Sequence, residues 1–133
     1  MSVNHSSPLV SIILPTYNRA ALIMDTISNV RQQTYTNWEL VVVDDCSTDN
    51  TSALVAAIND ERIRLYKTPS RVGIAGSREA GVRISKGEFI AFLDSDDLWD
   101  PAKIEKQMEA KVKFFFAIIS VANFNKLTNK LSS

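Results

Sequence analysis

The sequence predicts an α/β fold in which a mostly parallel, Rossmann-like open sheet carries helices on both faces. Two observations favour this class: short runs of β-branched residues alternate with segments whose apolar residues recur at helical spacing. The runs are almost continuously apolar, as expected of parallel strands that are covered on both faces. With 133 residues, 45% of them hydrophobic, the chain is long enough for one domain with its own core.

The first half of the chain alternates strand and helix twice. A β-rich run over residues 10–14 predicts the first strand, which stops at a proline. Asn18 is expected to cap the helix that follows. A second strand is predicted over 38–43, and a short helix with cap residues near Asp49 comes after it.

The second half continues the alternation. The predicted elements are, in order, a strand at 63–66, a helix that follows Gly73 and ends at Lys86-Gly87, a strand at 89–93, a helix from Pro101 through Val112, and a fifth strand at 115–121. Glycine favours the end of a helix and proline its first residue. The order of strands and helices therefore indicates a parallel sheet.

Charge is distributed unevenly along the chain. Fifteen Lys and Arg balance fifteen Asp and Glu, so the formal net charge is zero, which disfavours a protein that binds nucleic acid through bulk positive charge. Every acidic residue lies at or before Glu109, whereas residues 111–133 contain four lysines and no acid. We therefore divide the chain into an α/β domain at 1–110 and a basic, apolar tail at 111–133.

Cysteine and histidine are each present once, as Cys46 and His5. A lone cysteine cannot form an intrachain disulfide, which favours a reducing compartment, and a histidine-rich zinc site is excluded. The N-terminal residues 1–8 do not have the pattern of a signal peptide. The longest apolar run, 114–119, is far shorter than the roughly 20 residues that span a bilayer. We expect a soluble, cytoplasmic protein.

Unusual residues follow three of the predicted strands: Pro15-Thr16-Tyr17, Asp44-Asp45 and Asp94-Ser95-Asp96-Asp97. Ligands of open parallel sheets bind beyond the carboxyl ends of the strands, so these residues predict a ligand site. Two acidic clusters on one edge repel each other unless a cation lies between them. Carboxylates suit Mg²⁺ or Mn²⁺, which also bind phosphate-bearing substrates. Taken alone, Asp44-Asp45 fits a solvated loop cap equally well.

Other phosphate-binding motifs are missing from the sequence. It contains neither a Gly-x-Gly-x-x-Gly after a strand nor a Walker lysine motif. We expect Gly73-Ile-Ala-Gly76 to supply close helix packing. Arg71 and Arg78 are candidate diphosphate contacts, although ordinary surface charge explains them as well.

Several motifs occur in an order that is typical of one family. They are VSIILPTYNR at 10–19, QTY at 33–35, WELVVVDDCSTD at 38–49 and KGEFIAFLDSDD at 86–97, followed by Trp99 and Pro101. From Pro8 to Met108 the chain resembles the N-terminal, nucleotide-sugar-binding half of the family-two glycosyltransferases of the GT-A fold. The ordered set of motifs is far more specific than any one of them.

The resemblance implies an inverting, metal-dependent transfer of a sugar from a nucleotide-diphosphate sugar to an acceptor. The first candidate for the donor is a UDP-sugar. The acceptor is a saccharide or a lipid-linked saccharide that the sequence does not identify. The nucleotide-sugar-binding residues that it implies are Pro15, Thr16, Tyr17, Asp45, Arg78, Asp94 and Ser95. Among them Asp45 would accept a hydrogen bond from the base. Mn²⁺ or Mg²⁺ would bind Asp96 directly, with Asp94 and Asp97 in support. The resemblance also implies that the protein is located in the cytoplasm or is peripheral to the inner face of a membrane.

The sequence also departs from the family pattern. Glu79 stands where asparagine is usual, and Cys46 stands where glycine is common. The family places its catalytic base, an aspartate, well downstream of Asp96, and no Asp or Glu follows Glu109. The catalytic residue therefore stays unknown, and we expect a truncated, incomplete or weakly active enzyme.

Two alternatives remain open at this stage. In the first alternative, the chain is a catalytically inactive fragment that acts as a binding or homo-oligomerisation module, because the apolar run in its tail would be exposed. The other alternative is a receiver-type signalling domain that binds Mg²⁺. That fold normally presents an acid pair on its first strand, whereas the first strand here ends in Pro15-Thr16.

Overall fold

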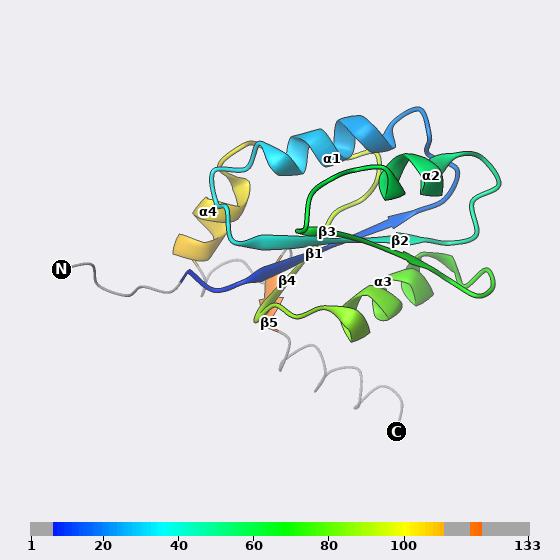
Figure 1. The fold of residues 1–133 in the computed structure, drawn as a ribbon. Coiled ribbons are helices and arrows are strands. Elements are labelled where there is room, and N and C mark those ends of the chain that lie inside the picture. The colour runs from blue at the N-terminus through cyan, green and yellow to red at the C-terminus, as the bar shows by residue number, and fades with distance from the viewer. Residues whose placement is uncertain (1–6, 111–117, 121–133) are drawn as a thin grey trace, which may run out of the picture.

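A computed structural model describes residues 7–110 and the backbone of residues 118–120 (Figure 1). A sheet with the strand order β3-β2-β1-β4-β5 forms its middle layer. The strands are β1 (Val10–Thr16), β2 (Trp38–Asp44), β3 (Ile63–Lys67), β4 (Phe89–Phe92) and β5 (Ile118–Ser120). β1 to β4 pair in parallel, and β5 pairs antiparallel with β4. The predicted α/β class with a mostly parallel sheet is confirmed.

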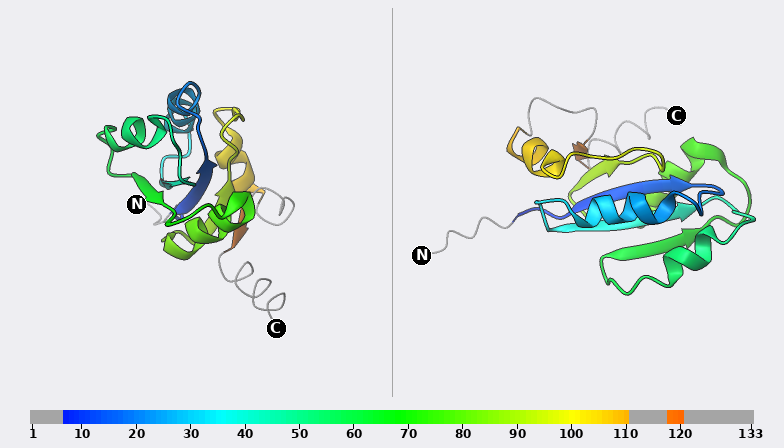
Figure 2. Two further views of the ribbon diagram at one scale, coloured as in Figure 1. Left: turned by 90° about the vertical axis from the view of Figure 1, so that its right-hand side faces the viewer. Right: turned by 90° about the horizontal axis from the view of Figure 1, so that it is seen from above.

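Helices cover both faces of the sheet, as the sequence predicts (Figures 1 and 2). The helices are α1 (Ile23–Arg31), α2 (Thr51–Ala56), α3 (Gly73–Ile84) and α4 (Lys103–Glu109). α1, α2 and α4 lie on one face and α3 on the other. A receiver-type domain has the strand order 2-1-3-4-5, so the observed order shows that this alternative is wrong.

The core consists of one apolar cluster on each face of the sheet. Along β1, Ile12 packs with the cluster under α1, and its neighbour Ile13 packs under α3, because successive strand residues point to opposite faces. α3 comes close to the sheet at Gly81, where an added Cβ would lie 2.5 Å from Cγ2 of Ile13. The close packing that we expect at Gly73-Ile-Ala-Gly76 is thus found at Gly81. Gly73 itself has φ +78°, a conformation that favours glycine.

Two predicted helix starts are wrong. Asn18 does not cap α1, which begins at Ile23 after Leu22. Asn18 has φ 50°, and its Oδ1 instead accepts hydrogen bonds from the backbone N–H of Thr48 and of Asp49 at 2.7 and 3.2 Å. Pro101 lies in the turn before α4, which begins at Lys103. Each residue instead makes a contact outside its helix, since the carbonyl oxygen of Pro101 accepts from the N–H of Thr34 at 2.8 Å.

The ends of the first four strands differ from the prediction by one or two residues. β1 continues through the proline to Thr16, where the register pairs Pro15 with Val43. The fifth strand is described at Ile118–Ser120 and pairs antiparallel with β4, and the rest of the predicted 115–121 lies outside the described residues. Val112 and most of the tail lie outside the described residues, so the division of the chain at residue 110 stays a prediction. In the part of the chain that the structure describes, no helix is long and apolar enough to cross a bilayer.

Candidate functional site

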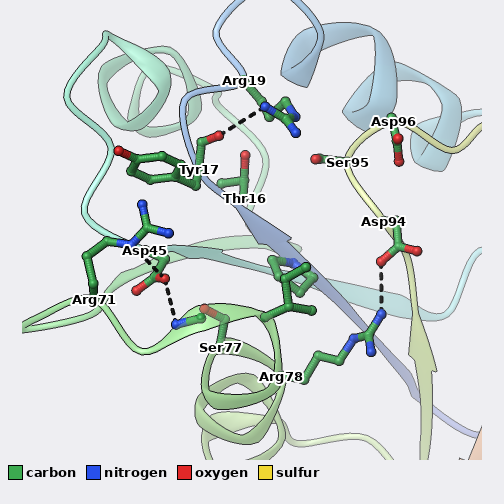
Figure 3. Close-up of a pocket in the computed structure, with 13 residues that line it drawn as sticks. Thr16, Tyr17, Arg19, Asp45, Arg71, Ser77, Arg78, Asp94, Ser95 and Asp96 are labelled. Atoms are coloured by element: carbon green, nitrogen blue, oxygen red, sulfur yellow. Dashed lines mark hydrogen bonds and ion pairs between the residues drawn. The ribbon is translucent and has the colours of Figure 1, made fainter.

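A pocket of about 500 Å³ opens at the carboxyl ends of β1, β2 and β4 (Figure 3). Eight predicted site residues line it: Pro15, Thr16, Tyr17, Asp45, Arg78, Asp94, Ser95 and Asp96. The structure thus brings the residues that follow three separate strands into one cavity. Asp97 is not among the lining residues, and its backbone N–H donates to the carbonyl oxygen of Asp94 at 3.0 Å.

Backbone contacts hold the strand ends together at the pocket. The N–H of Asp45 donates to the carbonyl oxygen of Thr16 at 2.9 Å, which ties the end of β2 to the end of β1. On the other side, the hydroxyl of Thr26 on α1 donates to the carbonyl oxygen of Ser95 at 2.8 Å. The loop after β4 is therefore fixed by a helix as well as by the sheet.

The two neighbouring aspartates at the end of β2 have different roles. The carboxylate of Asp44 accepts hydrogen bonds from the hydroxyls of Ser47 and Ser52, so it stabilises the turn into α2. Asp44 thus caps a loop, but it is buried, so the prediction that this cap is solvated is wrong. Asp45 lines the pocket instead, and its side chain is only 5% exposed.

The carboxylate of Asp45 is surrounded by hydrogen-bond donors. Oδ1 accepts from the hydroxyl of Thr68 at 2.8 Å and from the N–H of Val72 at 2.9 Å. Oδ2 accepts from the N–H of Gly73 at 2.9 Å and pairs with Nε of Arg71 at 3.2 Å. Burial opposes ionisation, but the bonds from Val72, Thr68 and Gly73 and the charge of Arg71 outweigh it and lower the pKa of Asp45. Asp45 is therefore ionised at neutral pH, and its acceptor positions are filled.

An aromatic ring and a guanidinium form one wall of the pocket. The guanidinium of Arg71 lies 3.5 Å from the centroid of the Tyr17 ring. The side chain of Arg71 is 52% exposed, so it can leave Asp45 at less cost than the buried backbone donors can. The ring of Tyr17 offers a flat face on which a planar base can stack.

The loop after β4 contributes two carboxylates with different partners. Asp94 pairs with Arg78 at 3.0 Å, and both side chains are substantially exposed. Asp96 has neither a hydrogen bond nor an ion pair with any residue that the structure describes. Three polar atoms of lining residues are buried without a hydrogen-bond partner: Oγ1 of Thr16, Oγ of Ser77 and Nε of Arg78. Unpaired polar atoms at a pocket wall favour a polar ligand.

The metal-ligating side chains at the pocket suit a metal ion that is also bound by a substrate. Among the described residues, no three or more His, Cys, Asp or Glu side chains are gathered to hold a metal ion. Mg²⁺ is usually bound through one or two carboxylates, with substrate phosphates and water as its other ligands. Asp94 and Asp96 provide such a pair of carboxylates at the pocket. The residues therefore fit a metal ion that takes part of its ligands from a phosphate, but not a metal ion that is coordinated by protein side chains alone.

Five lining residues lie outside the set that the family resemblance implies: Arg19, Arg71, Gly73, Ile74 and Ser77. Of these, Arg71 is already a candidate diphosphate contact in the sequence analysis. Arg71 carried a signal, because it stands beside the Gly73-Ile-Ala-Gly76 segment as a cation before a helix. Arg19 is the last residue of the first motif, VSIILPTYNR, and this position was its signal. Ser77 carried no signal, because its place depends on how α3 docks against the sheet.

Comparison with known families matches residues 11–129 to a model described as Glycosyl transferase family 2. One curated relative is WfgD of Escherichia coli, a UDP-Glc:alpha-D-GlcNAc-diphosphoundecaprenol beta-1,3-glucosyltransferase. The two sequences are 43% identical over 126 residues, which cover 92% of this chain and 50% of WfgD. The chain thus spans about half the length of this relative.

Two solved structures are similar in both fold and sequence. The mannosyltransferase PcManGT from Pyrobaculum calidifontis, in complex with GDP-Man and Mn²⁺, gives a TM-score of 0.69 at 34% identity, covering 78% of this chain and 32% of that one. TarS of S. aureus in complex with UDP-GlcNAc gives a TM-score of 0.70 at 31% identity, covering 75% of this chain and 30% of that one. Both neighbours hold a nucleotide sugar.

Proposed function

The chain belongs to glycosyl transferase family 2, and from this premise we propose that its pocket binds the nucleotide-diphosphate part of an activated sugar for transfer to an acceptor. The observation that carries the proposal is the convergence of eight predicted residues on one pocket at the strand ends. The nucleotide sugars bound to PcManGT and TarS support it. A UDP-sugar is the proposed donor, as in the name of WfgD.

We propose that the base binds at the wall formed by Tyr17 and Arg71. Pro15 and Thr16 lie at the end of β1 beside this wall. A uracil stacked on Tyr17 would direct its imide N–H to Asp45. Since the acceptor positions of Asp45 are filled, Arg71 would release the carboxylate as the base arrives. The backbone donors from Val72 and Gly73 would keep Asp45 ionised and in place.

We propose that Mn²⁺ or Mg²⁺ binds at Asp96 and Asp94, as the Mn²⁺ in the PcManGT complex suggests. When bound, such an ion neutralises charge that develops on the leaving nucleotide diphosphate. Arg78 orients Asp94 through their ion pair, and the hydroxyl of Ser95 lies beside it in the loop. Asp97 would act only indirectly, through the turn that it forms with Asp94.

We propose an inverting transfer to a lipid-linked saccharide, since the acceptor in the name of WfgD is a diphosphoundecaprenol glycolipid. Such an acceptor would bring the protein to the inner face of a membrane. We assign no catalytic base, because no acidic residue follows Glu109. Residues 1–133 alone should therefore bind the donor and turn it over weakly or not at all. Self-association of the chain stays a prediction.

A thermal-shift panel tests the proposal, because a ligand that binds only the folded state stabilises it by mass action. We expect UDP with Mn²⁺ to raise the melting temperature, with GDP as the second candidate and ADP as a comparison. At a concentration about 100 times Kd the stabilisation is about 2.7 kcal/mol. Asp96→Ala should remove the Mn²⁺-dependent part of the shift. Glu61→Ala, at an exposed acid away from the pocket, should keep it. No shift with any nucleotide would refute the proposed donor site.

A further inference from the structure

The charges that line the pocket are only partly paired with one another. Three arginines and three aspartates line it: Arg19, Arg71, Arg78, Asp45, Asp94 and Asp96. Arg71 pairs with Asp45 at 3.2 Å, and Arg78 pairs with Asp94 at 3.0 Å. Within the described part of the chain, Arg19 and Asp96 are left without an ion pair. The pocket thus offers one cation and one carboxylate that no ion pair neutralises.

The side chain of Arg19 is held only weakly. Its Nη1 donates to the carbonyl oxygens of Tyr17 and Asn18 at 3.4 and 3.5 Å, at the long limit for a hydrogen bond. A guanidinium has five N–H donors, so most of them have no partner among the described residues. Arg19 can therefore turn toward a ligand without breaking a strong contact.

The backbone of Arg19, by contrast, is firmly placed. Its N–H donates to the hydroxyl of Thr51 at 3.0 Å, and its carbonyl oxygen accepts from the N–H of Leu22 and of Ile23 at 3.0 and 2.8 Å. These contacts tie residue 19 to the first turns of α1 and α2. They do not involve the side chain, so a substitution at residue 19 should leave the fold intact.

We propose that Arg19 is the specificity-determining cation for the diphosphate of the nucleotide, an inference that rests on the proposed function. Arg71 lies against the ring of Tyr17, where the base is proposed to bind, so it is assigned to the base. Arg78 would have to share or leave Asp94 to bind a phosphate, and that would remove the ion pair that holds Asp94. Arg19 binds a phosphate at no such cost, through charge-assisted and bidentate hydrogen bonds. In Figure 3, Arg19 lies with Ser95 and Asp96 along the upper part of the pocket. Arg19 thus binds the diphosphate beside Asp96, which would hold the proposed metal ion, while Tyr17 and Arg71 receive the base.

Calorimetric titration of uridine, UMP and UDP, each with Mn²⁺, separates the base from the phosphates. Arg19→Ala should raise the Kd for UDP about 10- to 100-fold, because a hydrogen bond to a charged group contributes about 1.5–3 kcal/mol. The Kd for uridine should stay within about twofold, since uridine has no phosphate. Arg19→Lys should recover part of the UDP affinity by keeping the charge without the planar fork. Arg83→Ala is the matched control, because Arg83 is 75% exposed and pairs with Glu79 outside the pocket.

The outcomes distinguish this inference from the proposed function. If the unchanged chain binds neither UDP nor GDP, the proposed function fails and the inference fails with it. If GDP binds in place of UDP, the guanine series of ligands is used in the same way. If the nucleotide binds and Arg19→Ala leaves the Kd for the diphosphate unchanged, the role of Arg19 alone is overturned. An equal loss for uridine also overturns it, and the melting temperature of Arg19→Ala without ligand shows whether the fold has changed.

Discussion

At the scale of single residues, Asp45 links the pocket to the fold around it. Its carboxylate accepts two backbone N–H groups and the hydroxyl of Thr68, so it fixes the segment that leads into α3. The same carboxylate faces the pocket and pairs with the exposed guanidinium of Arg71. Once Arg71 leaves, this carboxylate, kept ionised by the donors of the loop, can accept a hydrogen bond from the N–H of a base.

Cys46, the next residue, adopts a backbone conformation that favours glycine. Its φ is 64°, and its Sγ donates to the carbonyl oxygen of Thr68 at 3.3 Å. The left-handed conformation costs a residue with a side chain roughly 1–2 kcal/mol. This explains in physical terms why glycine is expected at this position.

We predict that Cys46→Gly is more stable than Cys46→Ala by about 1 kcal/mol. Both variants lose the thiol, so the difference isolates the backbone strain, partly offset by the greater freedom of glycine in the unfolded chain. Urea denaturation of the two variants measures it. Equal stabilities, or a more stable alanine variant, would show that φ at residue 46 is unstrained.

Residue positions were predictable where they depend on strand ends and not where they depend on loops. Tyr17, Asp45 and Asp96 follow strands that lie side by side in the sheet, so their convergence could be inferred from the sequence. The contact of Asn18 with Thr48 joins two loops thirty residues apart, and no local pattern reports it. The same is true of the N–H groups that surround Asp45.

At the scale of elements, a buried polar cluster joins three strands at the end of the sheet opposite the pocket. Glu39 on β2 accepts from the hydroxyl of Ser11 on β1 at 2.6 Å and from the N–H of Lys86 at 2.5 Å. Arg64 on β3 donates to it at 2.8 Å. The cluster therefore connects β1, β2 and β3 with the turn between α3 and β4, which sets where β4 begins.

This cluster should make stability depend on pH in the acid range. Burial opposes the ionisation of Glu39, but the N–H of Lys86, the hydroxyl of Ser11 and Arg64 outweigh it and lower its pKa. A lowered pKa means that the stabilisation is complete above the unfolded value of about 4.3 and is lost as the pH falls through the folded value. We predict that Glu39→Gln is less stable by about 2 kcal/mol at pH 7, where charged hydrogen bonds are lost.

The difference in unfolding free energy between the unchanged chain and Glu39→Gln should shrink as the pH falls below about 4. Denaturant titrations from pH 7 to pH 3 measure this difference. Glu88→Gln is the control, because Glu88 is exposed and should show little difference at any pH. A constant gap for Glu39→Gln across this range would contradict the role assigned to the ionised carboxylate.

At the scale of the whole molecule, the strand order determines where the pocket lies. β1 lies between β2 and β4, so the ends of these three strands are adjacent. β2 and β3, the strands that follow β1 in the chain, lie on one side of it in the sheet, and β4 lies on the other. Such a switch in strand order is where open α/β sheets bind ligands. α3 closes the pocket from one face of the sheet, and the loop after β4 closes it from the side of α1 (Figure 3).

The fold class was predictable as a whole because strand and helix patterns alternate without interruption over residues 10–109. The antiparallel direction of β5 was not, because a three-residue strand at the edge carries no directional signal. Eight of the residues that line the pocket were predictable from the motifs, whereas the acceptor was not. The chain spans only about half of its relative WfgD, and no residue of the described pocket identifies an acceptor.

The central claim is that the pocket binds a nucleotide diphosphate together with a metal ion at Asp96. Calorimetric titration of UDP with and without Mn²⁺, in the unchanged chain and in Asp96→Ala, tests it most directly. We predict that Mn²⁺ lowers the Kd for UDP at least about tenfold in the unchanged chain, which is about 1.4 kcal/mol of coupling, and has little effect in Asp96→Ala. The same Mn²⁺ effect in both chains would contradict the claim, as would a failure of the unchanged chain to bind either UDP or GDP.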